Sequence, residues 1–136
     1  MSDEIIDKKI AKIREYLEVL NALKDDCIHK MKSDKVFRGS VLYYMHIVAD
    51  SCVALAEMVI RLKNFPKPQS YAEAIDILGT QKILPDEFAY DFARIAGFRN
   101  FLAHDYEKVN YEEICLYMIT RLDSISQYLH YIESHI

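Results

Sequence analysis

The chain has 136 residues, of which 51% are apolar and 28% charged, with only three glycines and three prolines. This composition predicts one ordered helical domain over residues 1–136 and leaves little room for disordered tails. The net charge of -4 argues against a general nucleic-acid coat, which is normally basic. It still leaves room for a small site that binds one or two phosphates.

Cys27, Cys52 and Cys115 are odd in number, far apart and placed in apolar helical patterns. We therefore predict three reduced core cysteines, as in a cytoplasmic protein. The acidic N-terminus has no apolar signal core, and this argues against secretion. The longest apolar-rich run, residues 53–62, contains two charged side chains and is too short to span a bilayer. We expect a cytoplasmic protein that does not enter a membrane.

Apolar residues recur at alternating steps of three and four, which is the period of an amphipathic helix. The first such segment spans residues 4–31. The second begins near Val41 and ends near Phe65, because Pro66 and Pro68 cannot continue a helix. A second apolar face on this helix indicates packing between several neighbours, or between the bundle and a second subunit. The main stripe consists of Val41, Met45, Val48, Cys52, Leu55, Val59 and Leu62.

The second half of the chain predicts one short helix and two long ones. A capping box at residues 70–73 begins the short helix, and Gly79 ends it. Pro85 opens a helix that continues to about His104, and the last helix follows a similar capping pattern at residues 110–113. With no alternating strand pattern, the chain predicts an all-α fold without β-sheet, an up-and-down four-helix bundle with one additional short helix.

One pattern in this second half indicates chemistry. Arg99 and Tyr106 occupy the apolar register of their helix, where a guanidinium is costly to bury without a partner. His104 follows five residues after Arg99, and histidine is the side chain that most readily moves a proton near neutral pH. Asn100 shares a helix face with His104 and can orient the imidazole or contact substrate. An arginine for a phosphate and a histidine for a proton suggest phosphodiester cleavage.

Such chemistry on RNA needs no metal. His104 can act as base on a ribose 2′-hydroxyl or as acid on the departing 5′-oxygen, and Arg99 can stabilise charge on the phosphorane oxygens. Five residues at about 100° each place the two side chains about 140° apart around a helix. They converge only if the helix loosens near its end, or if a second copy completes the cleft, and a two-fold dimer is the simpler geometry.

A structural interpretation fits the same residues. Arg99 would then pair with Asp50 or a glutamate, and His104 would cap the helix at its negative end. His46 and Asp50 also stand four apart, as metal ligands can, but no second pair and no Glu-x-x-His pattern accompanies them. We therefore expect neither a metal site nor a cofactor.

The segment Arg99-Asn100-Phe101-Leu102-Ala103-His104-Asp105-Tyr106 matches the Arg-x4-His-x-Tyr signature of HepT-type HEPN-domain proteins. The similarity extends upstream through residues 70–74, 83–85 and 96–100, and it covers nearly the whole chain. The sequence therefore resembles the toxins of the HepT/MntA toxin–antitoxin family.

This resemblance implies an all-helical, HEPN-like homodimer that acts as a metal-independent endoribonuclease, the toxin of a type VII-like pair. Arg99 and His104 would be catalytic, with Asn100 and Asp50 in support. The partner would be an MntA-type nucleotidyltransferase antitoxin that adenylylates Tyr106 with ATP, adding charge that repels RNA. The competing hypothesis is a non-catalytic helical dimer that only binds a minimal nucleotidyltransferase.

Overall fold

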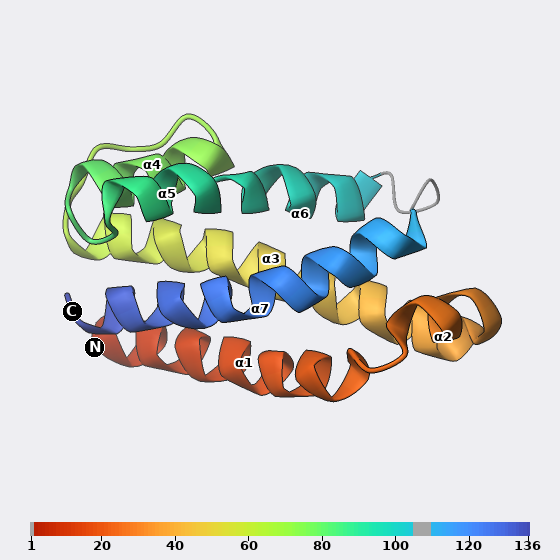
Figure 1. Ribbon diagram of the computed structural model, residues 1–136. Helices are drawn as coiled ribbons and strands as arrows, with labels where there is room; N and C mark the ends of the chain where they lie inside the picture. The colour runs from red at the N-terminus through yellow and green to blue at the C-terminus, as the bar shows by residue number, and fades with distance from the viewer. Residues whose placement is uncertain (1, 105–109) are drawn as a thin grey trace.

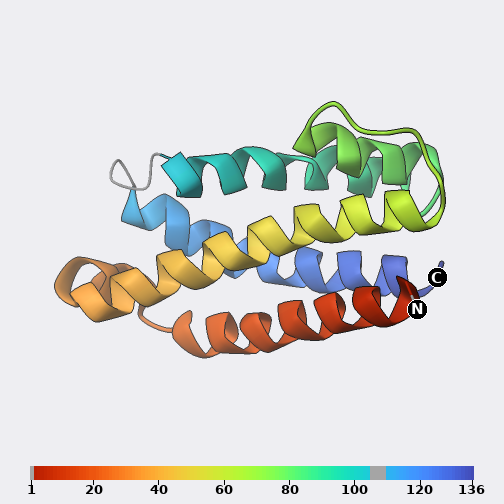
Figure 2. The same cartoon turned by 180° about the vertical axis from the view of Figure 1, so that it is seen from behind.

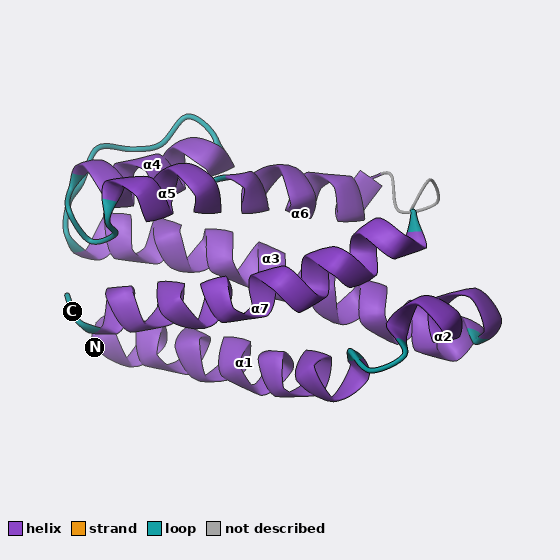
Figure 3. Ribbon diagram, in the orientation of Figure 1, coloured by secondary structure: helices purple, strands orange, loops and turns teal. Residues whose placement is uncertain are grey.

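The computed structural model describes residues 2–104 and 110–136 of the chain. Within these ranges the chain forms helices and no strand, as predicted (Figure 3). The elements are α1 (Ser2–Leu23), α2 (Cys27–Ser33), α3 (Lys35–Leu62), α4 (Tyr71–Thr80), α5 (Asp86–Phe92), α6 (Arg94–His104) and α7 (Tyr111–Glu133).

The long helices run alternately up and down, with α1, α3, α7 and the α5–α6 pair as the four members of the bundle (Figure 1). The short helix α2 lies at one end, and α4 packs on α3 and α5 toward the other (Figures 1 and 2). Buried apolar residues from all seven described helices form one core cluster. None of the described helices is long and apolar enough to cross a membrane.

The predicted first helix is in fact two helices. α1 ends at Leu23, Asp26 adopts a left-handed conformation with φ of 56°, and α2 then begins at Cys27. Lys24 interrupts the apolar series at this point, so no buried contact favours a continuous helix across it. Aspartate tolerates the left-handed region better than most residues, and this allows the chain to turn.

The helix that carries the predicted site is also divided. α5 ends at Phe92 and α6 begins at Arg94, with Ala93 between them. The amide of Ala96 bonds to the carbonyl of Ala93 at 3.2 Å, three residues back, which tightens the chain at the junction. Because the helix is interrupted here, the side chains of α6 do not have to follow the helical register of α5.

Gly79 lies inside α4 and does not end the helix, which continues to Thr80. A Cβ atom at Gly79 would lie 2.6 Å from the Cβ of Ala89 on α5. The glycine is therefore required by the close approach of two helices. Ser70 does begin α4 as predicted, because its hydroxyl accepts a hydrogen bond from the amide of Glu73 at 3.1 Å.

The cysteine prediction is wrong for two of the three residues. Cys27 on α2 and Cys115 on α7 form a disulfide, with Cα atoms 5.8 Å apart and a sequence separation of 88. Their wide spacing in sequence gave no sign of this pairing, which depends on how α2 folds back against α7. Cys52 on α3 is a free buried thiol as expected, and burial raises its pKa.

Candidate active site

Arg99 on α6 is held by an acidic residue of the neighbouring helix α3. Its Nε donates to Oδ1 of Asp50 at 2.8 Å. The arginine side chain is only 20% exposed and the aspartate 52% exposed, so a mostly buried cation meets a partner that water still reaches. The sequence had identified Asp50 as a partner for Arg99, and the structure places the two in contact.

Two further side chains orient the same guanidinium. Nη1 of Arg99 donates to Oδ1 of Asn100 at 3.2 Å, and the guanidinium carbon lies 5.1 Å from the ring centre of Tyr71. Tyr71 is the first residue of α4, so Arg99 contacts side chains from three helices. A guanidinium over an aromatic face gains cation–π attraction and is fixed in its plane.

This arrangement leaves part of the guanidinium available. Arginine carries five N–H donors, of which Asp50 and Asn100 engage two, so three remain. Among the described residues none accepts a hydrogen bond from these three. Planar donors of this kind fit the oxygens of a phosphate.

His104 is the last residue of α6, and its side chain is exposed. Within the described ranges its imidazole forms no hydrogen bond or ion pair, and Asn100 bonds to Arg99 rather than to it. α6 stays helical through His104, so of the two ways to bring Arg99 and His104 together, loosening of the helix up to this residue does not occur. Within one chain, Arg99 and His104 therefore remain about 140° apart around the helix axis.

Tyr106 lies outside the described residues, so its predicted position beside the cleft stays a prediction. Asp50, which stands four residues after His46, bonds to Arg99. The described part of the chain holds no group of three or more His, Cys, Asp or Glu side chains that fits a metal ion. Nε2 of His46 is buried and has no hydrogen-bond partner among these residues.

Aromatic packing sets the position of α6 on the bundle. Phe98, the neighbour of Arg99, stacks on Tyr117 of α7 with ring centres 3.8 Å apart and planes at 14°. Burial raises the pKa of Tyr117 to about 12, so its ring stays neutral. Two residues after Asp50 on α3, a further contact forms between α7 and α3, where the buried hydroxyl of Tyr128 donates to the carbonyl of Cys52 at 2.7 Å.

A pocket of about 330 Å³ opens beside Arg99 and is lined by two of its contacts, Tyr71 and Asn100. Sequence analysis missed Tyr71, because a single tyrosine after a helix cap carries no periodic signal. It also missed Glu57, which lines this pocket two turns along α3 from Asp50. The one available signal was the polar stripe of α3, on which Asp50 and Glu57 are seven residues apart. The remaining lining residues are Pro68, Gln69 and Ser70.

Comparison with known proteins shows which family this chain resembles over nearly its whole length. A sequence model of the family described as Ribonuclease HepT-like matches residues 6–132. The mRNA nuclease HepT of Shewanella oneidensis is 21% identical over 132 residues, which cover 97% of this chain and 98% of that protein.

Solved structures agree on the fold. A toxin–antitoxin crystal structure with AMP-PNP superposes with a TM-score of 0.88 at 20% identity, covering 97% of this chain and 99% of that one. The tri-AMPylated HEPN toxin of Shewanella oneidensis, in complex with its MNT antitoxin, gives 0.86 at 21% identity and covers 96% and 98%. YutE of Bacillus subtilis, a cytosolic protein of unknown function, gives 0.76 at 18% and covers 95% and 89%.

The helical bundle has the fold of the HEPN class of proteins, to which the superposed toxin belongs. Within that class, the chain belongs to the HepT-like ribonuclease family, since the family's sequence model spans nearly all of it. This confirms the family that the segment around Arg99 and His104 had indicated.

Proposed function

We propose that this protein is the toxin of a type VII-like toxin–antitoxin pair and a metal-independent endoribonuclease with Arg99 and His104 at its site. The observation that carries the proposal is the support of Arg99, which Asp50, Asn100 and Tyr71 orient while three N–H donors stay available. Such a group can stabilise charge that develops on a phosphate, without reorganising during the reaction. The mRNA nuclease activity named for the Shewanella relative supports RNA as the substrate class.

The chemistry follows from the residue types. His104 removes the proton of a ribose 2′-hydroxyl, and the resulting oxygen attacks the adjacent phosphorus. The bond from phosphorus to the 5′-oxygen breaks, and a protonated imidazole returns a proton to that oxygen. The products are a 2′,3′-cyclic phosphate and a 5′-hydroxyl end. Arg99 stabilises the negative charge on the two non-bridging oxygens of the phosphorane.

We propose that the active form is a homodimer. α6 keeps Arg99 and His104 on different faces of the helix, so a second copy is the direct way to complete a site with both residues. Two copies of His104 across a two-fold axis would also supply both the base and the acid. Sedimentation or light scattering on the purified protein should give twice the 15.9 kDa chain mass.

We also propose a cognate MntA-type nucleotidyltransferase as the antitoxin, with Tyr106 as the residue that it adenylylates. The Shewanella relative, described as tri-AMPylated and bound to an MNT antitoxin, supports this partner. Incubation with the antitoxin and ATP should add adenylyl mass to the wild type and none to Tyr106→Phe. We further place the protein in the cytoplasm, as one domain over residues 1–136, which cell fractionation and limited proteolysis would check.

The test of the ribonuclease is cleavage of RNA by the purified protein in excess EDTA, with analysis of the new ends. We expect cyclic phosphate and 5′-hydroxyl ends from the wild type, and a loss of about 100-fold or more in His104→Ala. His135→Ala is the matched control, because His135 is an exposed histidine near the C-terminus whose ring contacts the carbonyl of Tyr131. Equal cleavage by all three proteins, or activity that EDTA removes, would contradict the proposal.

One observation favours a second candidate function. The ion pair of Arg99 with Asp50 is the contact that a purely structural arginine would make. In that case the protein is a non-catalytic dimer that serves as a binding partner of a nucleotidyltransferase. Folded wild-type protein that binds the antitoxin but cleaves no RNA, with His104→Ala behaving identically, would favour this alternative.

A further inference from the structure

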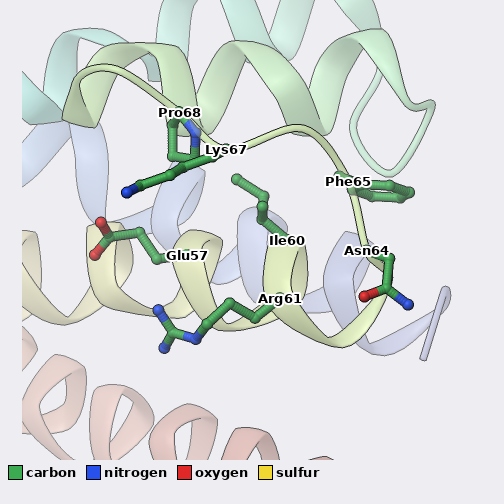
Figure 4. A pocket seen from close by; sticks show the side chains of 7 residues that line it. All are labelled: Glu57, Ile60, Arg61, Asn64, Phe65, Lys67 and Pro68. Atoms are coloured by element: carbon green, nitrogen blue, oxygen red, sulfur yellow. The ribbon is translucent and has the colours of Figure 1, made fainter.

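Two pockets meet along α3 next to Arg99. The first is the pocket of about 330 Å³ beside Tyr71 and Asn100, and the second has a volume of about 400 Å³ (Figure 4). Glu57 and Pro68 line both, so the two pockets are neighbours between α3 and the segment that leads into α4, and we refer to the pair as the channel. Each volume lies within the range of about 300–1,000 Å³ that is typical of small-ligand sites.

The near pocket has both polar and apolar lining residues, and one of its walls is fixed by hydrogen bonds. The amide of Gln69 donates to Oε1 of Glu73 at 2.9 Å, and the hydroxyl of Ser70 caps α4. These bonds hold the backbone around Tyr71, while the side-chain amide of Gln69 has no partner among the described residues. The pocket is therefore lined by an aromatic ring, an amide without a partner among the described residues and the Glu57 carboxylate, together with Asn100, which bonds to Arg99.

The far pocket carries the positive charge. Figure 4 shows Arg61 and Lys67 on either side of the Glu57 carboxylate, with Asn64 and Phe65 toward the other end. In the part of the chain that the structure describes, neither Arg61 nor Lys67 forms an ion pair or a side-chain hydrogen bond. Two cations and one carboxylate give the channel a net positive charge within a protein whose total is -4.

We propose that this channel binds the RNA nucleotide next to the scissile phosphate and that Glu57 selects guanine there. The inference rests on the proposed ribonuclease function, because Arg99 at the near pocket is the group that would hold the scissile phosphate. Arg61 and Lys67 then contact the next phosphate along the strand, one turn of α3 beyond Glu57.

Guanine is the base that fits a carboxylate. Its Watson–Crick edge carries two adjacent donors, N1–H and N2–H, which a carboxylate accepts with both oxygens. Adenine and cytosine each place a ring acceptor beside a single amino donor, so one carboxylate oxygen would face a lone pair. Uracil offers one donor between two carbonyl oxygens. Each alternative base leaves Glu57 repelled or half bonded, which is how a pocket discriminates.

The test is cleavage of a panel of single-stranded RNA oligonucleotides that differ only in the base at one position. We expect the wild type to cleave beside guanine about tenfold faster, or more, than beside the other bases. Glu57→Gln replaces one acceptor with a donor and should reduce this ratio to near one. Glu18→Gln, a change of the same kind at an exposed glutamate of α1, should keep the wild-type ratio.

A second measurement does not depend on Glu57. Binding of a 2′-O-methyl oligonucleotide, which cannot be cleaved, is measured against salt for the wild type and for the double variant Arg61→Ala, Lys67→Ala. Loss of the contacts to this one phosphate of a single strand should reduce the slope of log K against log salt by about 0.7. An unchanged slope would place the strand elsewhere on the protein and overturn the channel.

The outcomes test the base selection by Glu57 and the ribonuclease activity separately. Wild-type cleavage that is indifferent to base, or equal guanine preference in Glu57→Gln, overturns the selection by Glu57 and leaves the ribonuclease intact. No cleavage of any RNA by folded wild-type protein overturns the proposed function itself, and this inference with it.

Discussion

Arg14 and Arg99 both pair with carboxylates on other helices, and they do so in different ways. Arg14 on α1 uses both Nη atoms toward Glu133 of α7, at 2.9 and 2.5 Å. Arg99 on α6 uses Nε toward Asp50 of α3 and only one Nη toward Asn100. The Glu133 carboxylate bonds to both Nη atoms at the end of the Arg14 guanidinium. At the same end of Arg99, only Nη1 has a partner, and Asp50 bonds to Nε instead.

This difference separates an arginine that joins helices from one that is positioned for a ligand. Arg14 and Glu133 are 40% and 37% exposed and satisfy each other. Each arginine uses two of its five N–H donors, but Arg99 is more buried than Arg14 and keeps three of its four Nη donors without a partner in the described residues, whereas Arg14 keeps two. A group that is desolvated, oriented and still short of acceptors is prepared for an anion.

The largest expected effect comes from deleting each arginine in turn. Arg99→Ala should lower RNA cleavage by about 100-fold to 1,000-fold, because it removes the donors that face the phosphorane. Arg14→Ala should leave the cleavage rate unchanged, since it removes an ion pair at the surface between α1 and α7. The measurement is single-turnover cleavage of one defined oligonucleotide, with circular dichroism to establish that both variants are folded.

Asp50→Asn should have a smaller effect on the same reaction. The amide keeps one acceptor for Arg99 but loses the charge, so the guanidinium is held less firmly, and we expect a loss of about tenfold to 100-fold. Asp50→Glu should recover part of the rate, because it restores the carboxylate. Full activity in Asp50→Asn would show that Arg99 does not depend on this partner.

The smallest effect is expected at the surface pair. The hydrogen bond from Arg14 lowers the pKa of Glu133 below its ordinary value of 4.5. A lowered pKa in the folded state adds stability above pH 4.5, and this stability is lost as the pH falls through the folded-state pKa. Because the pair is exposed and screened by solvent, Glu133→Gln should cost at most about 1 kcal/mol at neutral pH.

Urea unfolding of the wild type and Glu133→Gln, at neutral pH and at about pH 3, measures this difference. The two proteins should differ at neutral pH and converge in acid. His130 also lies 3.8 Å from Glu133, so His130→Ala is a useful control for the neighbouring ring. A gap that grows in acid would contradict the sign of the pKa shift.

The sequence was a good guide to α3 and α7 and a poor one to the helix junctions. The stripes of these helices are long enough for periodicity to identify them, and the prolines after α3 fix its end. The start of α3 at Lys35 depends on Asp34, whose side chain accepts hydrogen bonds from the amides of Val36 and Phe37. The breaks after Leu23 and Phe92 depend on packing between distant elements, which a one-dimensional pattern does not contain.

For the site, the motif and the acidic partner were accessible from sequence, because a cation in an apolar register requires a counter-charge. The contacts of Arg99 with Tyr71 and Asn100 were not, since the first depends on where α4 crosses α6. The disulfide of Cys27 with Cys115 was missed for a similar reason, because it depends on how α2 folds back. That a second copy completes the site around His104 stays a prediction, which sedimentation or light scattering on the purified protein tests.

The Cys27–Cys115 bond has a topological consequence. It closes a covalent ring that contains α3, α4, α5 and α6, and therefore every residue assigned here to catalysis or base selection. A protease that cuts once in the exposed segment between α3 and α4 would open this ring without releasing either part. On a gel, the nicked protein would run as one species until a reducing agent separated its two fragments.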